Sequence, residues 1–443
     1  MSLTAGAAEV VITPPIGMHL DGYGARNSGS TGVHDDLHAR ALVLNDGTTR
    51  VALVSCDLIG VDRRLVARVR DLASNATGIP GGNMLIAATH THAGPAGLRA
   101  DLDASLTDTM SRLIAGAIDA ASRRMQPTVL KAGRGSVDSV SQNRRDPGGP
   151  ADDALRVLLF DAPNSRDTAV ASILSFACHP TVLFHTNMQM SADYPGYALA
   201  TVRKIVGDAP SLFFNGACGD VNPAWIEQDY HEAERVGSIV GAEAARRLQE
   251  LRPLGSQQKV WNIRWEELTD KPIHGDLIEP RLRVASRRIA LRLRQLDPPE
   301  SYDARVAQLE FQRAKLDPGD IEARRRLMEQ ITQLRGEHGV ASRLRAGGTH
   351  YLHPEIQAIS LGAGCAVLGL PGEFFVETAR EIQAAAGIRH LLVACYANHH
   401  VFYVVPRHEF GRGGYEPGVA LLDEDAEETV RAAAIALLRE VSA

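Results

Sequence analysis

The sequence MLIAATHTHAGPAG, residues 84–97, places a short apolar segment directly before a polar, turn-forming one. Met84–Ala88 is typical of a buried strand, and the Gly and Pro residues that follow it favour a loop. Between the two stand His90 and His92, whose side chains point the same way on an extended segment. Because open α/β sheets bind ligands beyond the carboxyl ends of their strands, this stretch predicts an α/β fold with a site at a strand end.

The rest of the chain fits the same alternation of strands and helices. We predict strands at Glu9–Ile12, His38–Leu44, Arg50–Ser55, Leu155–Phe160, Val170–Ala177, Leu212–Phe214, Glu355–Leu361, Cys365–Leu370 and His390–Cys395, and helices at Thr107–Arg123, Tyr197–Val206, His231–Leu251 and Ala426–Val441. A segment rich in Arg, Glu, Gln and Leu, about 279–345, predicts a helical hairpin insertion with solvated charges. We therefore expect one domain, 1–443, of layered mixed β-sheets flanked by helices.

Composition excludes several classes of protein. With 44% hydrophobic and 23% charged residues and a net charge of -6, the 443-residue chain resembles an ordinary globular protein, without the basic stripe of a nucleic-acid binder. No apolar run reaches about 18–20 residues, so we expect no stable membrane insertion. The five cysteines lack a C-x-x-C pair and favour a reducing compartment. We expect a cytoplasmic protein, or a periplasmic or secreted one if a leader was removed.

Polar residues that suit a metal follow three further predicted strands. His179 lies in FACHPT, Glu373 lies in LGLPGEF, and YANHHVFY carries Tyr396, His399, His400 and Tyr403. A single histidine after a strand is more often an ordinary core or loop residue, so the recurrence at strand ends carries the argument. Imidazole and carboxylate without thiolate favour Zn²⁺ in a catalytic site with an open position.

ATHTHAGPAG resembles the THTHSGPGG signature of the neutral/alkaline (non-lysosomal) ceramidases. The similarity continues in order through GVHDDLHARALVL, QNR, CHPT, GDVNP, LPGEF and YAN…Y…YEP, from about Ala8 to Pro417. Members of this family are zinc amidases that cleave the N-acyl bond of ceramide. The resemblance implies an α/β catalytic domain and a hydrolytic function that uses Zn²⁺.

The resemblance also assigns roles to residues. It implies four zinc ligands and a surrounding group of catalytic residues: the ligands are His90, His179, Glu373 and Tyr403, and the catalytic residues are His92, Arg144, Asn222 and Tyr415. His92 becomes a candidate general base or acid, and Arg144 and Tyr415 become candidates to stabilise the developing oxyanion. Asn222, which occupies the position of the family's motif serine, could donate its NH₂ to the same oxygen.

Two departures from the family pattern shape the expected function. An amide such as Asn222 cannot form an acyl-enzyme, so we expect a zinc-bound water as nucleophile; Cys218 is better explained as a buried structural thiol. The chain ends soon after Tyr415, without the family's immunoglobulin-like domain, so we expect a small soluble N-acyl amide or ester as substrate. The alternative is a non-catalytic protein of the same fold with a structural zinc or a ligand-binding role. Whether the chain forms a homo-oligomer is left open.

Overall fold

Two β-sheets packed face to face form the centre of the protein. The computed structural model describes residues 2–99, 102–163, 169–252, 259–262, 267–270, 275–347 and 349–443. The larger sheet runs in the order β11 (Ser211–Asn215), β9 (Ala169–Phe176), β8 (Ala154–Asp161), β6 (Gln126–Ser136), β1 (Leu3–Val11), β3 (His38–Asn45), β4 (Arg50–Cys56) and β5 (Met84–Ala88), and β15 (Asp276–Ile278) pairs with β6. Only the pairs β4–β5 and β9–β11 are parallel among the described strands of this sheet.

The second sheet has the order β16 (Pro280–Arg288), β19 (Glu355–Gly362), β20 (Cys365–Gly369) and β22 (His390–Ala394). Its apolar face packs on the larger sheet, and one buried cluster joins Leu42 and Leu85 to Ile359 and Val367. Because side chains alternate along a strand, the neighbouring Val43 faces the opposite way, into a cluster shared with helices. Central strands such as β3 are therefore buried on both faces.

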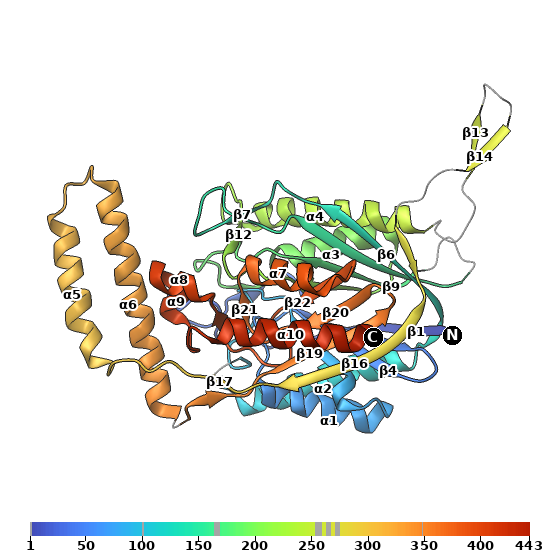
Figure 1. The fold of residues 1–443 in the computed structure, drawn as a ribbon, viewed down its shortest axis with the longest axis horizontal. Helices are drawn as coiled ribbons and strands as arrows, with labels where there is room; N and C mark the ends of the chain where they lie inside the picture. The colour runs from blue at the N-terminus through green and yellow to red at the C-terminus, as the bar shows by residue number, and fades with distance from the viewer. Residues whose placement is uncertain are drawn as a thin grey trace.

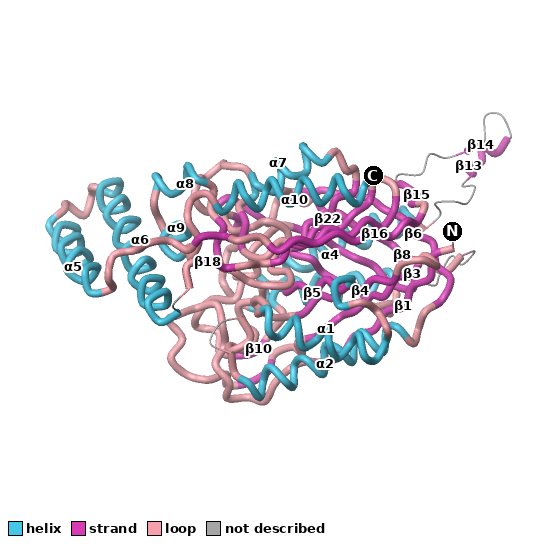
Figure 2. Tube along the Cα trace, turned by 60° about the horizontal axis from the view of Figure 1, so that its bottom comes forward, coloured by secondary structure: helices cyan, strands magenta, loops and turns pink. Residues whose placement is uncertain are grey.

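Helices cover the outer faces of both sheets (Figures 1 and 2). The larger sheet is covered by α1 (Arg63–Thr77) and α2 (Ala104–Ser122) at one end, and by α3 (Asp193–Val206) and α4 (Tyr230–Leu251) at the other. The second sheet is covered by α7 (Val376–Ala386) and α10 (Ala426–Ser442). This confirms the predicted α/β class with layered mixed sheets flanked by helices. Among the described helices, none combines the length and apolarity needed to cross a bilayer.

A helical hairpin projects from this body, but it begins later than predicted. It consists of α5 (Glu300–Lys315) and α6 (Ile321–Gly347), whereas residues 280–288 form the edge strand β16. β16 is rich in arginine because much of it is solvent-exposed, so its sequence resembles that of a surface helix. Figure 1 shows α6 beside α8 and α9, with α5 on its outer side.

Short elements complete the described structure. They are β2 (Gly32–Val33), η1 (Gly81–Asn83), β7 (Ser141–Asn143), β10 (Gln189–Met190), β12 (Val221–Pro223), β13 (Lys259–Asn262), β14 (Glu267–Asp270), β17 (Leu291–Arg292), β18 (Tyr351–Leu352), β21 (Glu373–Phe374), β23 (Tyr403–Val404), α8 (Arg407–Arg412) and α9 (Tyr415–Val419). Two pairs of these short strands, β7 with β12 and β21 with β23, position the candidate site.

Candidate metal centre and catalytic pocket

The predicted strand-end residues converge on one point. His90 follows β5, His179 follows β9, and Glu373 begins β21 shortly after β20. β21 pairs in parallel with β23, which sets Tyr403 beside Glu373. Strand β5 is joined directly to the loop after β22 by a bridge between Ala87 and Ala397. The sheet packing thus brings together side chains that lie hundreds of residues apart in sequence.

Three ligand atoms form a nearly regular triangle at this point. The Nε2 atoms of His90 and His179 lie 3.1 Å apart, and each lies 3.4 Å from Oε2 of Glu373. Ligands at about 2.0–2.2 Å from a tetrahedral zinc are separated by roughly 3.3–3.6 Å, so the triangle has nearly the size of one face of such a shell. All three side chains are buried.

The hydrogen bonds of the two histidines explain why a cation fits between them. Nδ1 of His90 lies 2.6 Å from the carbonyl oxygen of Ile59, and Nδ1 of His179 lies 2.7 Å from that of Cys218. A carbonyl only accepts, so each Nδ1 carries the proton and each neutral ring presents a lone pair at Nε2. Two lone pairs 3.1 Å apart repel each other unless a cation or a proton lies between them. Burial lowers the pKa of His179 to about 4, which favours the neutral, metal-binding form.

Glu373 is held as a carboxylate opposite these rings. Burial raises the pKa of its carboxyl group, but His90, His179 and His400 outweigh that effect and lower the pKa well below its ordinary value. Nδ1 of His400 accepts from the Phe402 N–H, so its neutral ring carries a proton on Nε2, 3.3 Å from Oε1 of Glu373. His400 therefore packs against Glu373, a contact the sequence did not reveal.

His92 lies close to the same atoms. Its Nε2 is 3.3 Å from Nε2 of His90, so distance alone permits it to act either as a ligand or as a neighbour of the reacting group. Burial, followed by the fields of His90 and His179, lowers the pKa of His92 well below its ordinary value. It is therefore neutral near pH 7.

Arg144 connects the remaining predicted residues. β7 pairs antiparallel with β12, which places the arginine after β7 beside Asn222 in β12. Its Nη1 donates to Oδ1 of Asn222 at 3.2 Å, its Nη2 donates to the Tyr403 hydroxyl at 2.8 Å, and its Nε donates to Glu416 at 2.8 Å. The ring of Tyr415 lies 5.8 Å from that of Tyr403. All eight residues predicted from the sequence therefore belong to one cluster.

The backbone around this cluster is locally strained. Among the described residues other than glycine, φ is positive at His90 (73°), Asp193 (55°), Tyr396 (57°), Asn398 (58°) and Phe402 (63°). Four of these five positions are ligand candidates or lie in the loop that carries His400 and Tyr403. Such conformations cost about 1–3 kcal/mol each and persist where the surrounding structure fixes them, which is common at functional sites.

The cluster opens into a pocket of about 430 Å³. His90, His92, Glu373, Tyr403 and Tyr415 line its inner part. Its outer wall contains residues that the sequence did not indicate: Tyr23, Arg99, Arg335, Gly339, Val340 and Arg343. Four of these six residues belong to α6, so the helical hairpin contributes directly to the pocket.

Asp57 and Asp193 are buried carboxylates whose hydrogen-bond partners are not the metal-binding histidine candidates. Asp57 accepts from Arg40 at 2.7 Å and from the His38 N–H at 2.9 Å. Asp193 accepts from the Leu183 and Tyr194 N–H groups at the start of α3. The outer nitrogens of His90 and His179 face backbone carbonyls instead.

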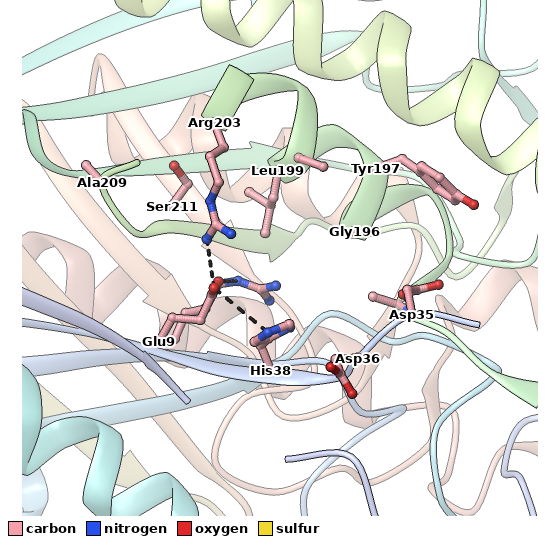
Figure 3. Close-up of a pocket in the computed structure, with 13 residues that line it drawn as sticks. Glu9, Asp35, Asp36, His38, Gly196, Tyr197, Leu199, Arg203, Ala209 and Ser211 are labelled. Atoms are coloured by element: carbon pink, nitrogen blue, oxygen red, sulfur yellow. Dashed lines mark hydrogen bonds and ion pairs between the residues drawn. The ribbon is translucent and has the colours of Figure 1, made fainter. Parts of the chain in front are cut away.

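A separate cavity of about 220 Å³ lies beside this charge network (Figure 3). Glu9 in its wall pairs with Arg40 and Arg203, each at 2.7 Å. Arg40 also binds the fully buried Asp57, which begins the loop whose Ile59 carbonyl fixes the His90 ring. We interpret this network as support for that loop.

Comparison with known proteins identifies the family. Residues 3–226, just over half of the chain, match the family described as "Neutral/alkaline non-lysosomal ceramidase, N-terminal". The protein belongs to this family, as the sequence motifs predicted. Family membership supports a hydrolase, and the fold agrees with it.

Individual relatives and solved structures agree with this assignment. The chain is 28% identical over 233 residues to a neutral ceramidase of Mycobacterium tuberculosis, an alignment of 46% of this chain and 36% of the relative. It is 25% identical over 482 residues to a neutral ceramidase of Pseudomonas aeruginosa, an alignment of 95% of this chain and 68% of the relative. The crystal structure of neutral ceramidase from P. aeruginosa superimposes with a TM-score of 0.73 at 20% identity, covering 100% of this chain and 75% of that one. The chain thus spans about a third of the length of the first relative.

Proposed function

We propose that this protein is a zinc-dependent hydrolase of amide or ester bonds, acting on a small soluble N-acyl substrate. The observation that carries the proposal is the pair of Nε2 lone pairs of His90 and His179, fixed 3.1 Å apart and facing the Glu373 carboxylate. The relatives are named neutral ceramidases, which favours an N-acyl amide as the bond cleaved. The pocket volume of about 430 Å³ is ordinary for a small-molecule site.

In this proposal His90, His179, Glu373 and Tyr403 hold the metal. Bound zinc supplies a polarised acyl carbonyl and a water molecule of lowered pKa. Burial raises the pKa of the Tyr403 phenol well above its ordinary value, and the Arg144 guanidinium opposes this effect. Arg144 therefore favours the charged form of Tyr403 that a metal would bind.

The other residues handle the proton and the developing charge. His92, neutral and buried beside the metal site, accepts a proton from the attacking water and returns it to the leaving amine. In this proposal Tyr415 and Arg144 donate to the developing oxyanion. Asn222 uses its Oδ1 as the acceptor for Arg144, which leaves its NH₂ as the group that can donate to substrate.

Cys218 does not supply the nucleophile in this proposal. The residue is fully buried, and burial raises the pKa of its thiol to about 12. A thiol in that state is protonated at pH 7 and is a poor nucleophile.

Metal analysis combined with kinetics tests the proposal. We expect about one zinc per chain, and chelator-sensitive hydrolysis of p-nitrophenyl esters and N-acyl amides that survives Asn222→Ala but not His90→Ala. A protein that binds stoichiometric zinc, hydrolyses nothing and unfolds on chelation would show a structural metal instead. The observation that favours a structural metal is the 3.3 Å distance between Nε2 of His92 and Nε2 of His90. At that distance His92 could serve as a fourth ligand and close the shell. Hydrolysis unaffected by complete removal of metal would refute the zinc mechanism.

A further inference from the structure

The hairpin helix α6 packs closely against the catalytic domain at α9. A Cβ atom built on Gly336 of α6 would lie only 2.8 Å from the Gly418 carbonyl carbon of α9. Arg294 adds a hydrogen bond to the Pro417 carbonyl at 2.6 Å and an ion pair with Glu337 of α6 at 2.8 Å. These contacts fix α6 over α9, at the edge of the catalytic pocket.

One face of α6 lines two pockets in succession. The pocket-lining residues of α6 recur at steps of one turn and are Arg325, Met328, Glu329, Thr332, Arg335, Gly336, Gly339, Val340 and Arg343. Those from 325 to 332 line a second pocket of about 640 Å³, and those from 335 to 343 line the catalytic pocket. Positions with this spacing form one stripe, and at 1.5 Å per residue the stripe is about 27 Å long. The same helix face is therefore a continuous wall of both pockets.

Tyr415 and Arg144 lie where the two pockets meet. Tyr415 lines both of them. Arg144 lines the second pocket, and its Nη2 donates at 2.8 Å to the hydroxyl of Tyr403, which lines the catalytic pocket. The guanidinium carbon of Arg144 is 5.9 Å from the centre of the Tyr415 ring. An acyl carbonyl held by these two residues would have one pocket on either side of it.

The two pockets differ in chemistry. The catalytic pocket has apolar and aromatic side chains in its lining, namely Leu20, Tyr23, Ile59, Val340, Phe402 and Val419. The second pocket is lined mainly by charged side chains, and each of its arginines is paired: Arg144 with Glu416, Arg145 with Glu409 and Glu416, Arg325 with Glu329, and Arg412 with Asp146 and Glu409. As many carboxylates as arginines take part in these pairs. The second pocket therefore suits a neutral polar group and not an anion.

Arg325 and Glu329 present hydrogen-bond donors and acceptors to such a group. Their one hydrogen bond within the described structure runs from Nε of Arg325 to Oε1 of Glu329 at 3.0 Å. The side chains are 63% and 45% exposed, so the NH₂ groups of the arginine and Oε2 of the glutamate are accessible. A guanidinium beside a carboxylate can bind two neighbouring hydroxyl groups, one as donor and one as acceptor. The half-exposed ring of Tyr415 adds an apolar face against which a sugar ring can pack.

We propose that the two pockets are arms of one substrate cleft, in which the second pocket binds the amine half of the N-acyl substrate as a neutral, hydroxyl-rich group such as an amino sugar. The inference rests on the proposed hydrolase function and specifies its substrate class. The acyl half then occupies the catalytic pocket, and the scissile C–N bond lies beside Tyr415 and Arg144. Hydrolysis breaks that bond, adds the oxygen of water to the acyl carbon and both of its protons to the nitrogen. The products are a carboxylate in the catalytic pocket and a protonated amine in the second pocket.

Matched amides test the second pocket. N-Octanoyl-glucosamine is compared with N-octanoyl-cyclohexylamine, which has a ring of the same size without hydroxyl groups. We expect kcat/KM to be about tenfold or more higher for the glucosamine amide, equivalent to about 1.4 kcal/mol, because its hydroxyls bond charged groups. Equal values would overturn the inference while the hydrolase function stands.

A double variant locates the preference on α6. Arg325→Met/Glu329→Met removes both polar partners together, so neither charge is left unpaired, and it should abolish most of the preference for the glucosamine amide. The intrinsic reactivity of the two amides cancels when the variant is compared with the wild type. The matched control is Arg326→Met/Glu322→Met, which removes a pair of the same spacing, also at 3.0 Å, outside both pocket linings. It should leave the preference within about twofold of wild type, because exposed pairs contribute little. A preference that survives the first variant, or falls equally in both, would refute the assignment.

Gly339→Leu tests which half of the substrate lies in which pocket. A Cβ atom on Gly339 would meet nothing within 4 Å, so a leucine there projects into the catalytic pocket. It should lower the ratio of kcat/KM for N-octanoyl-glucosamine over N-acetyl-glucosamine about fivefold or more, because the longer acyl chain loses its space. The preference for glucosamine over cyclohexylamine should persist. Loss of that preference instead would place the amine half in the catalytic pocket and overturn the inference.

Binding separates this inference from the proposed function. If no amide is hydrolysed, the hydrolase function fails, and dissociation constants of the two octanoyl amides decide the amine pocket. Tighter binding of N-octanoyl-glucosamine to the wild-type protein, lost in Arg325→Met/Glu329→Met, would support the pocket. Equal dissociation constants for the two amides would refute it.

Discussion

Replacing Arg144 by lysine tests how the catalytic side of the site is organised. The guanidinium makes three side-chain hydrogen bonds, to Asn222 at 3.2 Å, to the Tyr403 hydroxyl at 2.8 Å and to Glu416 at 2.8 Å. A lysine keeps the charge but cannot span three partners in fixed directions. If Arg144 both holds Tyr403 and stabilises the oxyanion, the loss corresponds to about 2.7–4 kcal/mol of transition-state stabilisation, a fall of about 10²–10³ in kcat.

The adjacent Arg145 is the matched control. It donates to Glu416 at 2.5 Å and to Glu409 at 2.7 and 2.9 Å. Arg145→Lys should therefore lower stability while kcat stays within a few-fold. The assay is steady-state hydrolysis of a fluorogenic N-acyl amide by zinc-loaded protein, with urea unfolding of each variant. Equal losses of kcat in the two variants would refute the reasoning, because the effect would then follow from the shared Glu416.

Three further predictions concern buried groups. Cys218→Ser should leave kcat within about threefold, because burial raises the pKa of the thiol to about 12 and keeps it protonated; a loss above a hundredfold in folded, metal-loaded protein would contradict this. Burial raises the pKa of the Asp193 carboxyl to about 7 in the folded protein, compared with about 3.9 in the unfolded chain. The protonated carboxyl therefore stabilises the fold fully below about pH 4, and this stabilisation is lost as the pH rises through 7. Urea unfolding between pH 5 and 8 should show a loss of about 2–3 kcal/mol that is absent in Asp193→Asn, and identical pH profiles would exclude it. Arg40→Met should cost about 3–5 kcal/mol in urea unfolding, because Asp57 is left buried without its cation; a change below about 1 kcal/mol would show that the pair is not needed.

The strand ends of the site were predictable because each carries an unusual polar residue after an apolar run. This holds for His90, His179 and Glu373, and the family motifs extended it to Arg144 and Tyr403. The comparisons show the family and the fold, and the individual ligand roles stay predictions. The carbonyls that fix the histidine rings are backbone atoms, so no residue type could have marked them.

Other features escaped prediction for different physical reasons. Helix α1 was not predicted, although its sequence carries signals for both of its ends. Asp62 caps its start, and Gly78 adopts a left-handed φ of 71° at its end. β16 was interpreted as helix because an exposed, arginine-rich edge strand has the composition of a surface helix. The role of α6 in the pocket depends on where the hairpin folds back, which the Gly336–Gly418 contact decides. Such a contact between distant segments leaves no local pattern.

The division of the candidate metal site between distant parts of the chain has a consequence for biosynthesis. The segment that matches the family, residues 3–226, contains His90 and His179 but not Glu373 or Tyr403. A nascent chain of that length presents two imidazoles without the carboxylate, and β19, β20 and β22 must dock before the shell is complete. Contacts of such sequence separation form slowly. If the proposed zinc site forms, we therefore expect tight metal uptake to follow translation, at a rate set by the docking of the second sheet on the first.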